Sequence, residues 1–215
     1  QNEVQLEQAK EQSEARMALW REVFAAAKEH KSIHFVYVSQ YSANEVMEDY
    51  KVQLAPEQYS VIHNLIDTDL FTYEKKDPEQ RKKIVTIKSF SSRVYANDLT
   101  VNGILELAKR PCFQELDFDI YGRGDLFKEL TAPLQKYKNV HLHERFLTSK
   151  EIASIHKTHG IYIGTTRSDT QGVSRSEAMS SGLVAIANNC TAIPEFMDDT
   201  CGILIPPESY VELAD

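Results

Sequence analysis

The sequence predicts an α/β fold: a doubly wound parallel sheet of the Rossmann-like kind, preceded by an N-terminal helical extension. From residue 84 onward, short β-branched runs alternate with helical segments, which is the order that builds a parallel sheet. The clearest repeat runs from Ile161–Ile163 through a polar loop and a helical stretch to Leu183–Ala187. Before residue 84, a helical stretch without Gly or Pro covers residues 3–29.

The first helix is expected over residues 3–29. Its C-terminal half places apolar side chains three or four positions apart, which gives the helix one apolar face. Residues 3–15 are much more polar. Two interpretations follow: the C-terminal half packs on the core while the rest projects into solvent, or the helix binds a partner. The apolar positions are Met17, Trp20, Val23, Phe24 and Ala27.

Two strands and a short helix are predicted next. Ile33–Val38 and Tyr59–His63 are rich in β-branched and aromatic residues, which favour strands. Between them, Ser42 and Glu45 have the spacing of a capping box and predict a helix that ends near Tyr50.

The predicted domain boundary follows residue 76. The stretch Asp77–Lys83 is a charged spacer, so residues 1–76 and 77–215 are assigned to different domains. In the loop before the spacer, Asn64 and Asp67 are expected to fix the chain through Asx turns.

Six strands and four helices are predicted in the second domain. Asn97 and Asp98 are expected to cap the first helix, and Thr148 with Glu151 forms a second capping box. Pro133 interrupts the second helix. The strands are expected at 84–89, 116–121, 139–143, 161–164, 183–187 and 202–205, and the helices at 98–109, 125–137, 149–157 and 173–181.

The candidate site lies where the loop after residue 164 meets the next helix. First-turn N–H groups have no partner within their helix and carry partial positive charge, so the helix end at Gly172 is suited to a phosphate. Asp169 precedes this end, and Glu177 lies eight residues later inside the helix. One carboxylate can therefore reach a crevice from the loop, and the other from the helix face.

The same stretch resembles a known motif. Asp169–Gly182 reads acid-x-x-Gly-x-x-x-x-Glu-Ala-Met-x-x-Gly, and Ile193–Glu195 and Gly202–Pro207 follow in the family's order. The run is similar to the Glu-x7-Glu signature of retaining glycosyltransferases of the GT-B fold, in particular the family-4 group (glycosyl transferases group 1). The family usually has Glu where this chain has Asp169, so this carboxylate lies one methylene closer to the backbone.

The resemblance implies a role for each site residue. Asp169 and Arg93 would be the catalytic residues: Asp169 would hold hydroxyls of the donor sugar, and Arg93 would clamp the donor diphosphate. Glu177 would accept hydrogen bonds from the ribose. The second cation of the clamp is not where the family has Lys, so Lys88 is an alternative source. The other substrate-binding residues would be Thr170, Gln171, Gly172, Val173, Ser174, Gly122, Gly124, Arg145 and Phe146.

The resemblance also implies the reaction. The chain is expected to transfer a sugar from a UDP- or GDP-linked nucleotide sugar to a glycan, lipid-linked or other acceptor, with retention, in polysaccharide or glycoconjugate biosynthesis. Residues 1–76 would be the end of the acceptor domain and the linker, and residues 77–215 the donor-binding domain, truncated at its C-terminal helices. Neither a metal nor another cofactor is expected. His141 and His143 share a strand face but lack a third ligand at a suitable spacing.

Composition limits the partners. The formal net charge of −8 argues against nucleic-acid binding, which relies on basic patches. No run approaches the roughly 18 apolar residues of a membrane-spanning helix. The cysteines lack CxxC spacing, which is typical of reduced thiols, so the protein is expected in the cytoplasm. Peripheral attachment to the inner face of the membrane is expected only through an N-terminal domain outside this sequence.

Two other functions stay open. The chain could be a non-catalytic nucleotide-sugar-binding or degenerate transferase module that acts as a partner subunit. Asp169 in place of Glu and the missing clamp Lys favour this alternative slightly. A GT-B epimerase or phosphorylase is the third alternative, although no candidate for a phosphorylase's pyridoxal-binding Lys stands out.

Overall fold

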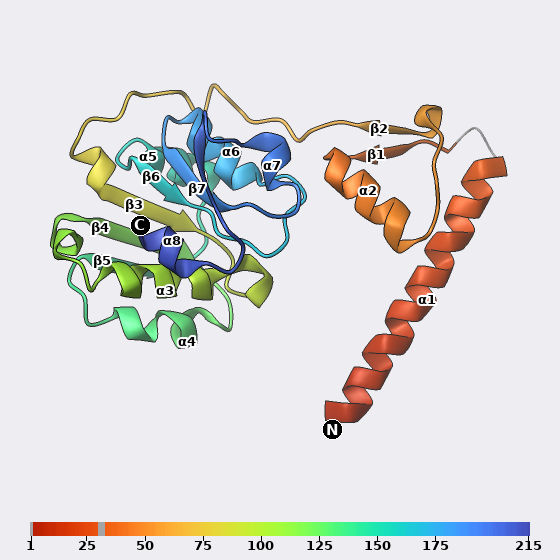
Figure 1. Ribbon diagram of the computed structural model, residues 1–215, viewed down its shortest axis with the longest axis horizontal. Helices are drawn as coiled ribbons and strands as arrows, with labels where there is room; N and C mark the ends of the chain where they lie inside the picture. Colours follow the sequence, from red (N-terminus) through yellow and green to blue (C-terminus); the bar gives the residue numbers. More distant parts are fainter. Residues whose placement is uncertain (1, 30–32) are drawn as a thin grey trace. The chain divides into compact units, whose positions relative to one another are not determined.

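The computed structural model describes residues 2–29 and 33–215 of the chain. The chain forms two compact units, Gln1–His63 and Asn64–Asp215 (Figure 1). The second unit contains a parallel sheet with helices on both faces, which confirms the predicted fold class.

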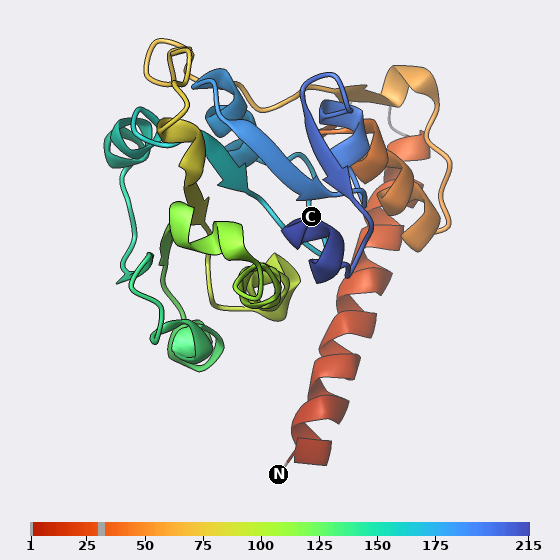
Figure 2. The same cartoon turned by 60° about the vertical axis from the view of Figure 1, so that its left-hand side comes forward.

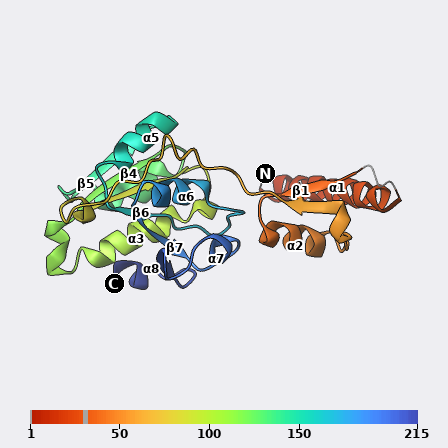
Figure 3. The same cartoon turned by 90° about the horizontal axis from the view of Figure 1, so that it is seen from above.

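The first unit is small. It contains α1 (Asn2–Glu29), β1 (Phe35–Tyr37), α2 (Gln40–Asp49) and β2 (Tyr59–Val61), and Figure 3 shows both helices beside the two strands. The strands are parallel and pair Phe35 with Tyr59. No helix in the described part of the chain is both long and apolar enough to cross a membrane.

The C-terminal half of α1 packs on the rest of the first unit. Phe24 is buried, and its ring centroid lies 4.9 Å from that of Phe35 and 5.4 Å from that of Tyr50. Residues 10–16 of the same helix are exposed. This agrees with the first interpretation of the helix, in which its apolar C-terminal half joins the core and its polar half faces solvent.

The start of α2 differs from the prediction. The N-cap is Ser39, whose side chain accepts the N–H of Ser42 at 3.0 Å, while Ser42 Oγ accepts the N–H of Ser39 at 3.3 Å. Ser42 is therefore the third helical residue, and the predicted capping box of Ser42 and Glu45 was wrong. The earlier start follows from the reciprocal bonds of the two serines, which satisfy N–H groups one turn before the predicted cap.

The sheet of the second unit has six parallel strands in the order β5-β4-β3-β6-β7-β8. The order reverses between β3 and β6, and this reversal defines the switch point of a doubly wound sheet. The strands are β3 (Lys83–Ile87), β4 (Asp117–Gly122), β5 (Val140–Glu144), β6 (Ile161–Ile163), β7 (Val184–Asn188) and β8 (Gly202–Ile205).

Helices cover both faces of this sheet (Figures 1 and 2). Adjacent residues of a strand point to opposite faces: Ile84 packs in the core beneath α3 and α4, whereas Val85 packs with Tyr162 beneath α5 and α6. The C-terminal helix α8 packs against α3. The helices are α3 (Asn97–Leu107), α4 (Phe127–Thr131), α5 (Ser149–His156), α6 (Val173–Ser180), α7 (Ile193–Phe196) and α8 (Tyr210–Ala214).

The segment 64–76 packs with the second compact unit, which begins at Asn64. Ser180 Oγ donates to the carbonyl of Phe71 at 2.7 Å. The Asx turn expected at Asp67 is present, since its Oδ1 accepts the N–H of Leu70 at 3.0 Å. Asn64 instead bonds through its backbone to a side chain of the site described below.

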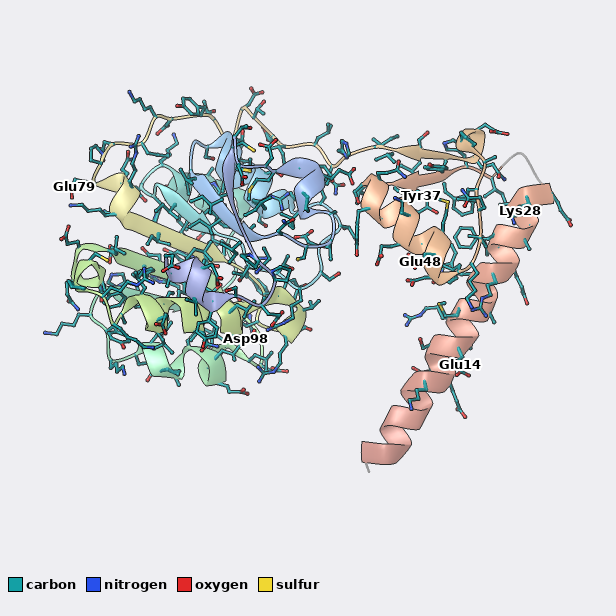
Figure 4. The ribbon with its side chains drawn as sticks, viewed as in Figure 1. Glu14, Lys28, Tyr37, Glu48, Glu79 and Asp98 are labelled. Atoms are coloured by element: carbon teal, nitrogen blue, oxygen red, sulfur yellow. The ribbon has the colours of Figure 1, made fainter. Side chains whose placement is uncertain are left out.

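The predicted cap of α3 was also wrong. The N-cap residue is Ala96, in the left-handed conformation with a φ of +51°. Asn97 Nδ2 donates to the carbonyl of Ser89 at 2.7 Å, and the Asp98 carboxylate (Figure 4) binds both terminal nitrogens of Arg167 at 2.8 Å. Both side chains are therefore used in tertiary contacts, which the local sequence does not show. The second box, of Thr148 and Glu151, is confirmed.

A buried histidine makes the stability of this fold depend on pH. His156 is fully buried, with Nδ1 3.2 Å from Ser181 Oγ, and its carbonyl accepts a hydrogen bond from Lys76 Nζ at 2.8 Å. Burial lowers the pKa of His156 to about 4, and the charge of Lys76 adds to this effect. The unfolded chain takes up a proton near the ordinary pKa of about 6.5. Stability from this site is therefore complete above about pH 6.5 and is lost as the pH falls toward the folded value.

Lowering the pH from about 7 to 5 should reduce the free energy of unfolding by roughly 2 kcal/mol more in the wild-type chain than in His156→Gln, which cannot titrate. Urea unfolding followed by circular dichroism at both pH values measures this difference. Equal pH dependence of the two proteins would show that His156 is protonated as easily in the folded state as in the unfolded state.

Candidate functional site

A cleft of about 360 Å³ lies at the carboxyl ends of β3 and β6, at the switch point of the sheet. Open parallel α/β sheets bind ligands at this place, because the chain leaves the two neighbouring strands toward opposite faces. Five of the predicted site residues line the cleft, and so do four basic or phenolic side chains. They are Asp169, Thr170, Gly172, Val173 and Ser174, with Lys88, Tyr95, Tyr162 and Arg175.

The loop that carries Lys88 is held by the turn after β4. The N–H of Lys88 donates to the carbonyl of Tyr121 at 3.0 Å. A Cβ at Gly122 would lie 2.0 Å from the carbonyl oxygen of Lys88, and a Cβ at Gly124 would lie 2.3 Å from the carbonyl carbon of Phe90. The two predicted substrate-binding glycines thus permit the close approach of two loops. They act on the cleft by positioning Lys88.

The carboxylate of Asp169 is fixed by its own loop. Its Oδ1 accepts the N–H of Gln171 at 3.0 Å, and its backbone N–H donates to Thr191 Oγ1 at 3.1 Å. Thr191 itself has a φ of +50°, an uncommon conformation for a β-branched residue. These contacts hold the Asp169 carboxylate at the wall of the cleft, where it presents hydrogen-bond acceptors at fixed positions.

The N-terminal end of α6 borders the cleft. Its N-cap is Gly172, with a φ of +81°, a conformation that favours glycine. No side chain of the described residues caps this end, so the amides of Val173 and Ser174 are available to a ligand. Together with the partial positive charge of the helix end, this arrangement suits an anion, as the sequence predicts.

Two cations share the cleft with one acid. Burial lowers the pKa of Lys88 to about 8, while the attraction of Asp169 opposes the change and the charge of Arg175 adds to it. Burial also lowers the pKa of Arg175, against the attraction of Asp169. Neither cation forms an ion pair with a carboxylate within the described ranges. The cleft therefore has uncompensated positive charge, which an anionic ligand would neutralise.

Glu177 lies on α6, one turn beyond the cleft-lining residues. It is half-buried, and burial raises its pKa. Burial raises the pKa of Tyr162 as well, and the charge of Glu177 adds to that rise, which places Glu177 near the cleft wall. The carboxylate is thus close to the cleft without belonging to its described lining.

Gln171 is buried, and its side chain binds the backbone of Asn64. Its Oε1 accepts the N–H of Asn64 at 2.7 Å, and its Nε2 donates to the carbonyl of Asn64 at 2.9 Å. The side-chain amide is therefore occupied by the backbone of the segment that begins the second unit. This pairing holds that segment against the loop that carries Asp169.

Arg93 lies outside the described lining of the cleft. Its Nη2 is 2.8 Å from Glu129 Oε1, and its side chain is 57% exposed. The structure thus brings Asp169 into one cleft with Lys88 and Arg175, whereas Arg93 is not among the described lining residues. Sequence reasoning proposed Lys88 as a second choice and missed Arg175, whose position inside a helix gave no signal of its own.

Arg145 and Phe146 lie at the end of β5 and outside the described lining of the cleft. Arg145 Nη1 is 2.7 Å from Glu151 Oε1. Phe146 is 68% exposed, and the Cζ of Arg123 lies 5.8 Å from its ring centroid. The pair of Phe146 and Arg123 offers a surface on which a planar base could stack.

The histidines of β5 are paired with aspartates of β4. His141 Nε2 is 2.8 Å from Asp117 Oδ1, and His143 Nε2 is 2.6 Å from Asp119 Oδ1. His159 binds the other oxygen of Asp119 at 3.1 Å. Within the described residues, no group of three or more His, Cys, Asp or Glu side chains could hold a metal. These histidines thus have structural partners.

The chain is similar to known glycosyltransferases. It is 28% identical over 156 residues to the UDP-N-acetylglucosamine–peptide N-acetylglucosaminyltransferase GtfA subunit of Streptococcus agalactiae, a match that covers 69% of this chain and 29% of the relative. The chain thus spans less than a third of that protein.

Solved structures share the fold. The C-terminal domain of the group 1 glycosyl transferase LpcC from Francisella tularensis superposes with a TM-score of 0.58 at 23% identity, covering 70% of this chain and 85% of that domain. S. aureus TarM, in complex with UDP, superposes with a TM-score of 0.69 at 18% identity, covering 85% and 35%. Pneumococcal GtfA, in complex with UDP and GlcNAc, superposes with a TM-score of 0.62 at 22% identity, covering 89% and 37%.

The family model described as "Glycosyl transferases group 1" matches residues 81–215, which include all six strands of the sheet of the second unit. The matched part contains the cleft, with Asp169, Gly172 and Glu177 in the order of the signature. The chain therefore belongs to the glycosyl transferases group 1 family, and its second unit has the Rossmann-like fold of a GT-B C-terminal domain.

Proposed function

We propose that this chain binds a nucleotide-sugar donor and forms the donor half of a retaining glycosyltransferase. The observation that carries the proposal is the cleft at the switch point, where the cations Lys88 and Arg175 and the end of α6 face the carboxylate of Asp169. Cations and free amides suit a diphosphate, and carboxylates suit sugar hydroxyls. The resemblance of residues 169–182 to the retaining signature supports retention.

A UDP-linked donor is favoured over a GDP-linked one. The relative from S. agalactiae is named for a UDP-sugar, and the TarM and pneumococcal GtfA structures contain UDP. In this proposal the uracil ring lies near Phe146, whose exposed side chain is next to Arg123. The diphosphate then extends toward the end of α6.

Four groups in and beside the cleft have a role in the proposed reaction. The amides near Gly172, with Lys88, bind the diphosphate and stabilise its charge as it departs. They take the part that a divalent metal has in other transferases, so the reaction is proposed to need no metal or other cofactor. Asp169 accepts hydrogen bonds from hydroxyls of the donor sugar and orients its anomeric carbon. Glu177 accepts hydrogen bonds from the ribose hydroxyls.

The acceptor side is assigned to the rest of the protein. Residues 1–76 are proposed to be the end of the acceptor domain and the linker, and residues 77–215 the donor domain. The acceptor is proposed to be a glycan or a lipid-linked group, reached in the cytoplasm or at the inner face of the membrane. A catalytically inactive binding module is the alternative, and turnover distinguishes it from an enzyme.

The chain should bind UDP and UDP-sugars but should not transfer the sugar by itself. A GT-B site needs groups of both domains in one geometry, so residues 1–215 alone should release UDP only by slow hydrolysis. Thermal shift with UDP, UDP-GlcNAc, UDP-glucose, GDP and CMP measures binding, and released nucleotide measures turnover with and without EDTA. Failure to bind any nucleoside diphosphate would overturn the proposal, and loss of binding with EDTA would overturn metal independence.

The affinity for UDP should fall as the pH rises from about 7 to 9. Bound diphosphate favours the charged form of Lys88, whose pKa in the free cleft is about 8, so binding raises that pKa. The contribution of Lys88 is therefore complete below pH 8 and falls by up to about tenfold per pH unit above it. Calorimetry should show this slope for the wild type and for Lys83→Met, at the other end of β3, but not for Lys88→Met. A flat wild-type profile would contradict the assignment.

Glu177→Gln keeps the shape of the side chain but removes its charge. Hydrogen bonds to an ionised acceptor are stronger than neutral ones, so UDP binding should weaken by about 1.5–3 kcal/mol. The wild type should also prefer UDP to 2′-deoxy-UDP, and the variant should lose most of that preference. If calorimetry shows the same preference in both proteins, Glu177 does not contact the ribose.

A further inference from the structure

One cation in the cleft wall has an unusual environment. Arg175, on the first turn of α6, is only 3% exposed although it lines the cleft. Its Nη2 donates to the carbonyl of Gln171 at 2.6 Å. Its Nε and Nη1 are buried and have no hydrogen-bond partner among residues 2–29 and 33–215.

Burial of such a group is costly. A charge removed from water loses its hydration, and only pairing restores that loss. Burial lowers the pKa of Arg175, and the charge of Asp169 opposes this effect without forming an ion pair in the described structure. The two free nitrogens therefore require an explanation, because nearly all buried polar groups in native proteins have partners.

Packing alone does not explain the arginine. The guanidinium fills the space beside Gly172, where a Cβ of that residue would lie 2.5 Å from Nη1. An unbranched apolar side chain such as Met could occupy this space without burying a charge. The position beside Gly172 does, however, put the positive charge next to the free amides of Val173 and Ser174 at the end of α6.

We propose that Arg175 is the main cation for the donor diphosphate, in the place that the resemblance assigns to Arg93. It acts as a positioning residue, because its hydrogen bond to Gln171 fixes the loop before α6. Its unpaired positive charge lies beside the amides that donate to the phosphate oxygens. The inference rests on the proposed function and names the residue that determines the affinity of this site for diphosphates.

Ligands that differ in charge distinguish this role of Arg175 from a purely structural role. The attraction between the guanidinium and one negative charge of the ligand, about 8 Å apart at an effective dielectric constant of about 20, strengthens binding roughly 30-fold. Arg175→Met should therefore weaken UDP binding by about 30-fold or more and UMP binding less, and should leave uridine binding within about twofold. Arg175→Lys, which keeps the charge, should restore most of the UDP affinity.

Calorimetry with UDP, UMP, uridine and inorganic pyrophosphate performs the test on the full chain. Arg81→Met is the matched control, because Arg81 is exposed and precedes the amino end of β3, whereas the cleft lies at its carboxyl end. Should Arg175→Met unfold, as judged by thermal melting, Arg175→Gln removes the charge and keeps a donor for the Gln171 carbonyl. Unchanged UDP binding in the charge-removing variant would overturn the inference, and so would an equal loss for UDP and uridine.

Ligand binding by the wild-type chain distinguishes failure of this inference from failure of the proposed function. If the wild-type chain binds pyrophosphate through Arg175 but binds no nucleotide, the anion site stands and the nucleotide-sugar assignment fails. If the wild type binds UDP and Arg175→Met binds it equally well, the nucleotide assignment stands and the role of Arg175 is wrong.

Discussion

The reversal of strand order between β3 and β6 decides where this domain can bind a ligand. The chain leaves β3 toward the face covered by α3 and leaves β6 toward the face covered by α6 (Figure 2). The two loops therefore separate at the carboxyl end of the sheet, and the space between them is the cleft. Side chains far apart in sequence, Lys88 and Asp169, become neighbours only because these two strands are adjacent.

The pairing of charges distinguishes two groups of cations in this acidic protein. Arg93, Arg145 and Arg167 each bind a carboxylate, and these pairs hold loops and helix starts in place. Lys88 and Arg175 have lowered pKa values caused by burial and no ion pair among the described residues. Cations that are paired with a carboxylate stabilise the fold, whereas cations without an ion pair can bind an anionic ligand. Net charge alone hides this difference.

Much of the fold could be predicted because its signals are local. Alternating strands and helices, the box of Thr148 and Glu151, and the loop from Asp169 to Gly172 depend on neighbours in the sequence. The predicted cap of α3 failed because Asn97 and Asp98 bind residues outside the helix, whereas the predicted box at Ser42 lay one turn too late, since Ser39 is the cap. Arg93 forms an exposed ion pair with Glu129, and Asp98 binds Arg167 and does not cap α3. The four-residue helix α7 was missed because one turn gives no periodic pattern.

Arg175 was missed for a related reason. A helical arginine reads as a solvated side chain, and only the three-dimensional structure shows that it folds back beneath Gly172. Lys88 follows an apolar strand, and that local position was enough to make it a candidate.

The side-chain amide of Gln171 connects the loop before α6 to the start of the second unit. Both backbone groups of Asn64, the first residue of the second unit, are held by this one side chain, at 2.7 and 2.9 Å. The backbone N–H of Gln171 donates to Asp169 Oδ1, and its carbonyl accepts a hydrogen bond from Arg175 Nη2. A ligand that rearranges this loop must therefore carry Asn64 with it or break both bonds. The point where the chain enters the second unit is thus tied by one side chain to the loop that lines the cleft.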